Sequence, residues 1–144
     1  MTRRTIPLCV TYVALLFVSS IGSEPVNCPD SVDVNQQLTA PVSGWTAMID
    51  DSPPRLANIT FYDGRPQQRA SLIYDQKMRV AGKETATWHF LPRADPQIWM
   101  GCSYTGTGIV LTKALPPSTS TCAVTYDTRQ TVAGLPSITK IVCK

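Results

Sequence analysis

Five cysteines carry the most reactive side chains of this sequence, and their spacing restricts the chemistry open to them. Cys9 lies in an apolar N-terminal stretch, and the other four follow at wide intervals, at Cys28, Cys102, Cys122 and Cys143. Zinc sites and thiol redox centres use close pairs such as C-x-x-C, and this sequence contains none. The even set of four therefore predicts two structural disulfides formed in an oxidising compartment, with no metal site, no cofactor and no thiol catalysis.

The four cysteines can pair in three ways. Cys102–Cys122 with Cys28–Cys143 closes loops of 21 and 116 residues, worth about 3.3 and 4.9 kcal/mol of chain entropy. Cys122–Cys143 with Cys28–Cys102 is worth about 3.3 and 4.5 kcal/mol, so loop entropy does not choose between these two. We favour Cys28–Cys143 with Cys102–Cys122, because a bond from Cys28 to Cys143 would hold both ends of the domain against one sheet.

The other candidates for acid–base or nucleophilic chemistry lie in settings that favour structure. His89 is the only histidine, and it alternates with Trp88 and Phe90, so we place it on the outer face of a strand. No serine lies in a G-x-S-x-G setting. Asp50-Asp51 is the one adjacent carboxylate pair, and the Ser52-Pro53-Pro54 that follows is typical of a solvated turn. We therefore expect no catalytic residue and a protein that is not an enzyme; a minor hydrolase is the least favoured alternative.

The N-terminus and the charge balance restrict location and partners. Arg3 and Arg4 precede an uncharged stretch from Pro7 to Ile21, and the small residues Gly22-Ser23 follow, as in a secretory signal peptide. We expect residues 1–22 to be cleaved, leaving a single β domain, residues 23–144, in the periplasm or secreted; retention of the leader as an anchor is the alternative. Without the leader, 11 basic residues face 10 acidic ones. That near-neutral balance predicts no nucleic-acid partner, and membrane contact only through the leader before cleavage.

Short segments of alternating apolar and polar residues, separated by proline and glycine, dominate the remaining sequence. Such alternation is typical of half-buried strands, whereas no long 3.6-residue period indicates helices. The segments with strand character are 32–38, 45–49, 56–62, 85–91, 98–104, 109–112, 122–126 and 138–143, and one short helix fits within 67–78. We predict an all-β fold, a small antiparallel β-sandwich or barrel of seven to nine strands with two disulfides. Trp45, Trp88 and Trp99 lie in apolar alternations, and we expect them in the core.

Since catalysis is disfavoured, we look for function in the loops, which carry most binding contacts on rigid β frames. Two turns contain arginine or tyrosine, the residue types that anchor protein interfaces. The candidate partner-binding residues are Asp63, Gly64, Arg65 and Arg69 in the first turn, and Tyr104 and Thr105 in the second.

Several short motifs together resemble a known group of proteins. They are Cys28-Pro29, Gly44-Trp45, Phe61-Tyr62-Asp63-Gly64, the stretch from Trp99 to Tyr104, and Cys122-Ala123-Val124-Thr125-Tyr126. The set is similar to an uncharacterised family of short exported proteins from Gram-negative bacteria, some of them encoded near type VI secretion genes. This resemblance implies a periplasmic immunity or accessory role and offers no catalytic residues.

A second, fainter similarity is to small periplasmic lysozyme inhibitors, which share a W-x-x-C-x-Y-like strand in a disulfide-tied β-barrel. Together the two resemblances lead us to expect a protein partner, either a toxin or a cell-wall hydrolase, and a role in neutralising a cell-wall-active enzyme. An envelope structural or adhesion component is the alternative.

Overall fold

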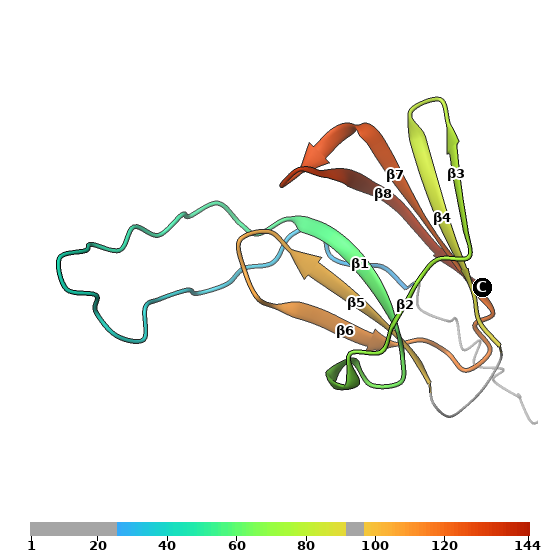
Figure 1. The fold of residues 1–144 in the computed structure, drawn as a ribbon, viewed down its shortest axis with the longest axis horizontal. Coiled ribbons are helices and arrows are strands. Elements are labelled where there is room, and N and C mark those ends of the chain that lie inside the picture. The colour runs from blue at the N-terminus through green and yellow to red at the C-terminus, as the bar shows by residue number, and fades with distance from the viewer. Residues whose placement is uncertain (1–25, 92–96) are drawn as a thin grey trace, which may run out of the picture.

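The computed structural model describes residues 26–91 and 97–144, so the expected leader lies outside the described range. Eight strands are found in the described residues. They are β1 (Leu56–Asp63), β2 (Ser71–Leu72), β3 (Gln76–Val80), β4 (Lys83–His89), β5 (Ile98–Tyr104), β6 (Val110–Ala114), β7 (Thr121–Val132) and β8 (Leu135–Cys143). They form two antiparallel sheets, β2-β1-β5-β6 and β3-β4-β7-β8 (Figure 1). The predicted all-β fold with two disulfides is confirmed.

Alternating side chains of the two sheets meet in one core. Phe61 of β1 is fully buried, and its ring centroid lies 4.8 Å from that of Trp88 and 5.6 Å from that of Phe90. Ala86, Trp88 and Phe90 are all buried, as their alternation predicts. The exposed His89 between Trp88 and Phe90 confirms its place on the outer face.

Two hairpins of the second sheet turn through the same dipeptide. Ala81-Gly82 joins β3 to β4, and Ala133-Gly134 joins β7 to β8; all four residues have φ between 49° and 80°. Two central residues with positive φ give the turn that matches the twist of paired strands. These turns help to fix the register that places Glu84 opposite Arg79, and Cys122 opposite Cys143 after two bulges in β7–β8.

The disulfide pairing that we favoured is wrong. The structure pairs Cys28 with Cys102, and Cys122 with Cys143. Cys122 and Cys143 face each other across the β7–β8 hairpin, with their Cα atoms 4.1 Å apart. Cys102 lies on β5 in the other sheet, where the N-terminal segment crosses it. The pairing therefore follows from which strands are neighbours. Our expectation that one disulfide would hold both ends of the domain did not take this into account.

The expected helix within 67–78 is also absent. One 3-10 turn, η1 (Pro66–Gln68), is followed directly by β2 and β3. In the described residues no helix is long and apolar enough to cross a membrane.

The segments 32–38 and 45–49 do not form the expected strands. Residues 33–53, which we call the arm, instead leave the sandwich as an extended loop (Figure 1, blue-green, left). Two of the three tryptophans lie outside the core. Trp45 is 81% exposed on the arm, and Trp99 lies half-buried on the outer face of β5, opposite Tyr62. Only Trp88 occupies the core as predicted.

Candidate protein-binding surface

The only histidine has a structural partner. The carboxylate of Asp75 accepts a hydrogen bond from the His89 backbone N–H at 2.7 Å and lies 3.3 Å from Nδ1 of the same residue. The Asp75 N–H in turn donates to the Thr87 carbonyl at 2.9 Å, so this pair fastens the β2–β3 connection to β4. Within residues 26–91 and 97–144, no group of three or more His, Cys, Asp or Glu side chains is arranged to hold a metal ion.

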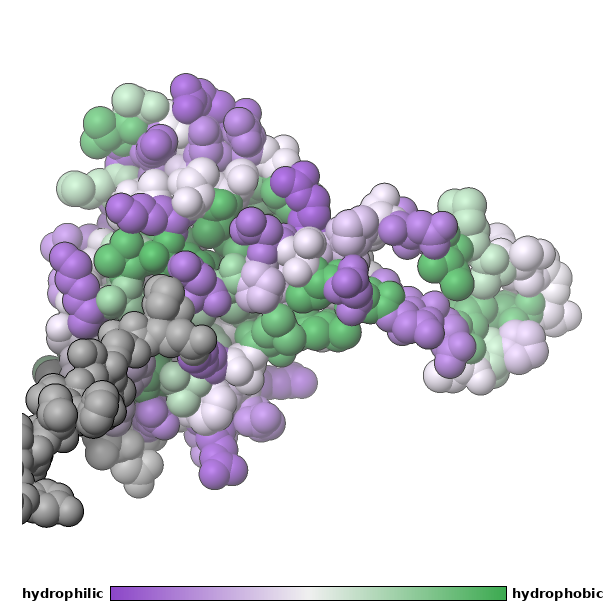
Figure 2. Space-filling model, turned by 180° about the vertical axis from the view of Figure 1, so that it is seen from behind, coloured by the Kyte–Doolittle hydropathy of each residue, from purple (hydrophilic) through white to green (hydrophobic). Residues whose placement is uncertain are grey.

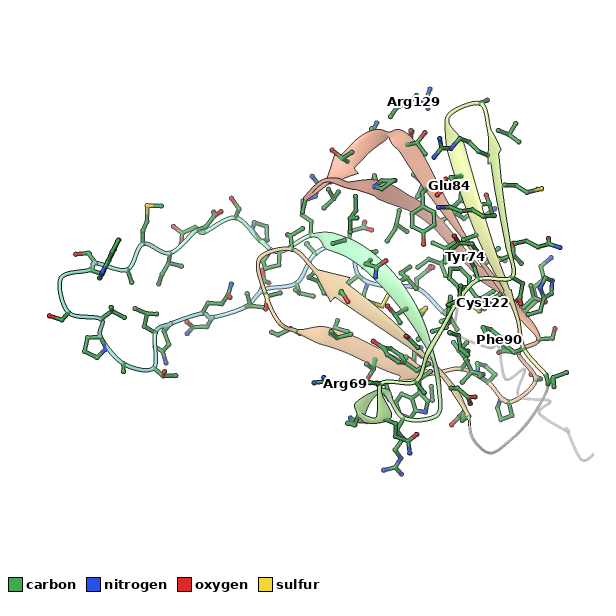
Figure 3. The ribbon with its side chains drawn as sticks, in the orientation of Figure 1. Arg69, Tyr74, Glu84, Phe90, Cys122 and Arg129 are labelled. Atoms are coloured by element: carbon green, nitrogen blue, oxygen red, sulfur yellow. A yellow bond between two sulfur atoms is a disulfide. The ribbon has the colours of Figure 1, made fainter. Side chains whose placement is uncertain are left out.

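A cleft of about 280 Å³ lies between the sheets, where β1 diverges from β4 and β7. In it, Oε1 of Glu84 lies 2.6 Å from Lys77 Nζ, and Oε2 lies 2.8 Å from Arg79 Nη2 (Figure 3). Hydrogen bonding from Lys77, with a smaller effect of Arg79, lowers the pKa of Glu84, although burial opposes the shift. Glu84 is therefore ionised and paired at neutral pH.

Tyr126 lies beside Glu84 in the same cleft. Burial, and then the charge of Glu84, raise the pKa of Tyr126 to about 12, so the phenol stays protonated. Glu84 is held in two ion pairs and Tyr126 is protonated, so neither group is poised to act as a general base or a nucleophile near pH 7. Sequence reasoning overlooked Glu84, although it precedes Ala86 by two residues and so belongs to the same inward face.

The two predicted binding turns lie at opposite ends of one sheet. In the β1–β5 pair, Asp63 faces Ile98 at one end and Leu56 faces Tyr104 at the other. An eight-residue strand spans about 23 Å, so the two turns do not form one compact site. The structure therefore separates Asp63, Gly64, Arg65 and Arg69 from Tyr104 and Thr105.

The first turn exposes its two arginines. Gly64 has φ 85°, and its N–H donates to the Gln97 carbonyl, while the Asp63 N–H donates to the Ala70 carbonyl. Arg69 closes η1 with φ 56°, and its N–H donates to Pro66 at 3.0 Å. Asp63 and Gly64 therefore shape the turn, while Arg65 and Arg69 are exposed to solvent. Figure 3 shows Arg69 beside η1.

The second turn is structural rather than exposed. Tyr104 is only 4% exposed, and its hydroxyl donates to the Pro29 carbonyl at 3.0 Å. Burial raises the pKa of Tyr104, which keeps that donor protonated. Thr105 accepts the Arg55 N–H on Oγ1 and donates its own N–H to the Arg55 carbonyl, both at 2.9 Å. Tyr104 holds the N-terminal segment, and its burial leaves almost no surface for the partner contact that we expected. Thr105 holds Arg55, just before β1, and as a half-buried residue it stays a predicted contact.

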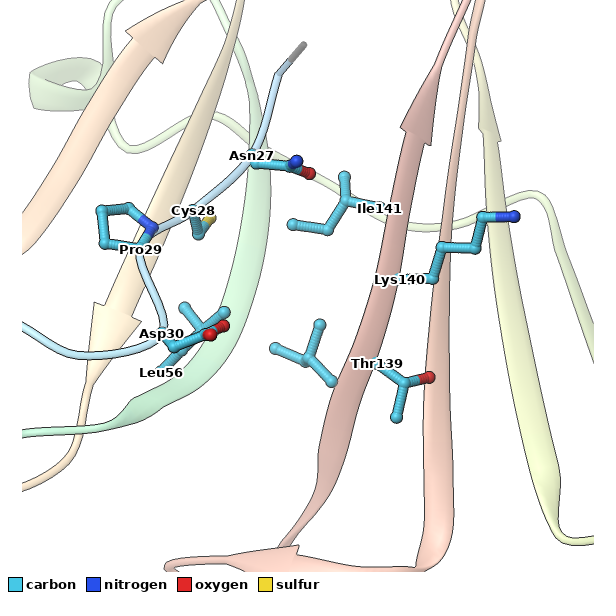
Figure 4. A pocket seen from close by; sticks show the side chains of 9 residues that line it. Asn27, Cys28, Pro29, Asp30, Leu56, Thr139, Lys140 and Ile141 are labelled. Carbon is cyan, nitrogen blue, oxygen red and sulfur yellow. The ribbon is translucent and has the colours of Figure 1, made fainter.

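These contacts belong to a base that fixes both ends of the arm. The Leu56 N–H donates to the Asp30 carbonyl at 2.8 Å, and the Val32 N–H donates to the Pro54 carbonyl at 3.1 Å. The Cys28–Cys102 disulfide joins the incoming segment to β5. On its other side, this segment faces Thr139–Ile141 of β8 across a cavity of about 360 Å³ (Figure 4).

The chain has a distant relative among curated proteins. A curated relative is an uncharacterised 16.3 kDa protein in the trpG 5′ region of Azospirillum brasilense. It is 28% identical over 125 residues, which cover 81% of this chain and 83% of that protein. No solved structure gives a significant match.

The model of the type VI secretion system Tli immunity protein family matches residues 51–144. This range includes all eight strands and both hairpin turns, but only the last three residues of the arm. The match confirms the resemblance to proteins linked with type VI secretion, and the chain belongs to the Tli immunity protein family.

Proposed function

We propose that this protein binds a type VI secretion toxin in the periplasm and neutralises it. Its membership of an immunity protein family, by a match that spans the whole sandwich, carries the proposal. An immunity protein family implies a toxin as the protein partner. Two disulfides support an oxidising compartment, and the N-terminal leader expected from the sequence supports export to it.

Neutralisation by binding agrees with the geometry of the sandwich. Its inward-facing charges are paired in the Glu84 cluster. One disulfide joins β5 to the N-terminal segment, and the other links β7 and β8 within the second sheet. Such a frame can hold a binding surface with little rearrangement, and a stable complex needs about 800 Å² buried on each partner. The protein then acts stoichiometrically and without turnover.

The toxin that we expect is an enzyme that acts on the cell wall. Its substrate class is tested by the damage that it causes in unprotected cells. Release of peptidoglycan fragments supports this class, whereas release of fatty acids or loss of nucleotides identifies a toxin of another class. In either case the binding proposal is judged separately, by protection.

The decisive experiment expresses the type VI toxin encoded beside this gene, directed to the periplasm of a sensitive strain. We expect the full-length chain to restore growth, and a variant lacking residues 1–22 to fail. The purified proteins should elute as one complex in gel filtration. If the full-length chain neither restores growth nor binds this toxin, the proposed function is wrong. Rescue by the leaderless variant alone would place the protein in the cytoplasm.

A further inference from the structure

The arm exposes a cluster of apolar side chains. Met48 is 93% exposed and Trp45 81%, and the other large apolar side chains of the arm are more than half exposed: Leu38, Val42 and Ile49. Figure 2 shows apolar surface along the outer part of the arm, and Leu38, Met48 and Ile49 of this group line a cavity of about 390 Å³ with Gly106 of the β5–β6 turn. Scattered exposed apolar residues are normal, but a contiguous group on a protrusion marks an interaction site.

Charge is divided between the arm and the sandwich. Between Asp30 and Pro54 there are four aspartates and no lysine, arginine or glutamate, whereas residues 55–144 contain eleven basic and five acidic residues. Asp33, Asp50 and Asp51 lie on the limbs nearer the base, and the apolar group lies between them toward the tip. The arm therefore combines an apolar tip with three aspartates nearer the base, Asp33, Asp50 and Asp51, which we call the collar.

The arm is fixed at its base, and beyond the base its limbs line a cavity with Gly106 of the β5–β6 turn. The Trp45 N–H donates to the Val42 carbonyl at 3.1 Å across the turn at the tip, where Gly44 has φ 80°. Among the described residues, no backbone hydrogen bond joins the two limbs between Val32–Pro54 and this turn. The limbs, residues 33–41 and 46–53, are long enough when extended to carry the tip about 30 Å from the sandwich.

We propose that the arm is the element that enters the toxin. Its apolar tip occupies an apolar cleft of the toxin, and Asp50 and Asp51 face basic side chains on the rim of that cleft. This inference rests on the proposed function and deepens it. A protrusion fits a concave receptor, and substrate clefts of enzymes are concave and largely apolar. Trp45 is the anchor, because exposed tryptophan that becomes buried dominates interface energies.

Two cavities in the described part of the sandwich are small for the arm of a second copy. The cavities beside the arm base and between the sheets hold about 360 and 280 Å³. Each has the size of one or two large side chains, whereas the tip presents five. The family match begins at residue 51, whereas the similarity to the Azospirillum brasilense protein covers 81% of this chain and so extends into the arm.

A pair of double variants tests the tip. Trp45→Ser with Met48→Ser should weaken binding to the toxin about 100-fold and abolish protection. Ile73→Ser with Leu91→Ser is the matched control, because these apolar side chains are 84% and 82% exposed on the sandwich. The control should bind within about threefold of wild type. Thermal unfolding of the free proteins checks that neither pair disturbs the fold.

A second pair tests the collar. Asp50→Asn with Asp51→Asn should slow association about tenfold at low salt, and the difference should vanish near 0.5 M salt, where charges are screened. Asp75→Asn, which changes an exposed carboxylate of the sandwich, should leave the association rate unchanged.

Fluorine NMR of the protein labelled with 5-fluorotryptophan shows the contact directly. With one fluorine on each tryptophan, toxin should shift the Trp45 resonance, assigned with Trp45→Phe, and leave those of Trp88 and Trp99 in place. Full binding by the Trp45/Met48 variant, or a shift of Trp99 without Trp45, would overturn the inference and leave the proposed function intact. Self-association that the same variant abolishes would assign the tip to a second copy and overturn the inference. No binding by the wild-type protein would overturn both.

Discussion

The arm and strand β4 contain similar alternating apolar residues, but these side chains are exposed in the arm and buried in β4. Trp45, Ala47 and Ile49 alternate with polar residues much as Ala86, Trp88 and Phe90 do. The β4 set is buried, because β3 and β7 pair with that strand and the other sheet covers its inner face. The arm set is exposed, because no strand pairs with it and no sheet faces it. Alternation thus makes a segment suitable for a sheet, and burial needs a second surface, which for the arm we assign to the toxin.

The largest expected effect comes from removing the disulfide that ties the base of the arm to β5. Replacing Cys28 and Cys102 by serine should lower the free energy of unfolding by about 4.5 kcal/mol, since this bond spans 74 residues. Replacing Cys122 and Cys143, which are 21 residues apart, should cost about 3.3 kcal/mol. Urea unfolding of both double variants measures the difference. An equal loss in the two would show that loop length does not govern their contributions.

A core substitution should cost almost as much. Phe61→Ala removes a fully buried ring in contact with Trp88 and Phe90, and should lower stability by about 4 kcal/mol. Urea denaturation measures this, and Phe61→Leu, which keeps most of the volume, should lose clearly less. If Phe61→Ala lost less than about 1 kcal/mol, the sheets would not depend on this contact.

A smaller effect depends on pH and belongs to the inter-sheet cleft. Because the folded-state pKa of Glu84 is lowered, its ionised form stabilises the fold above its ordinary pKa near 4.5. That contribution is lost as the pH falls through the lower folded value. Wild type should therefore exceed Glu84→Gln in stability at pH 7, and the two should converge toward pH 3. Curves that stay parallel over this range would contradict the pairing with Lys77 and Arg79.

The smallest expected effect is on the arm. Trp45→Ser removes a side chain that is 81% exposed, so the free energy of unfolding should change by less than about 0.5 kcal/mol. Calorimetry of the free protein measures this. A loss near that of Phe61→Ala would mean that Trp45 packs against the sandwich in solution, and the contrast between the two regions would fail.

Much of the sandwich could be predicted from sequence, because the evidence for it is local. The alternation around Trp88 and the glycines after Tyr104 each predicted an element that the structure contains. The disulfide pairing depended on which strands are neighbours, and no local pattern contains that information. The short helix that we expected within 67–78 is replaced by strands, because β2 pairs with β1 and β3 pairs with β4.

The candidate binding surface was predicted poorly, for related reasons. Tyr104 was selected by residue type, yet its burial depends on Pro29, which is 75 residues away in the sequence. The near-neutral total charge concealed the opposite charges of the arm and the sandwich, although their positions were readable in the sequence. Exposure of the tip could not be predicted, because it follows from the absence of a second layer.

The attachment of the arm also determines how the molecule resists force. One limb continues directly into β1, and the other is bonded through Cys28 to Cys102 of the adjacent β5. A pull on the tip is thus divided between two neighbouring strands and directed along both. Such a pull loads the hydrogen bonds of β1 to β2 and of β5 to β6 at the same time. A pull across the strands would instead break these bonds one after another. The base of the arm should therefore withstand a pull along the strands better than a pull that separates them one hydrogen bond at a time.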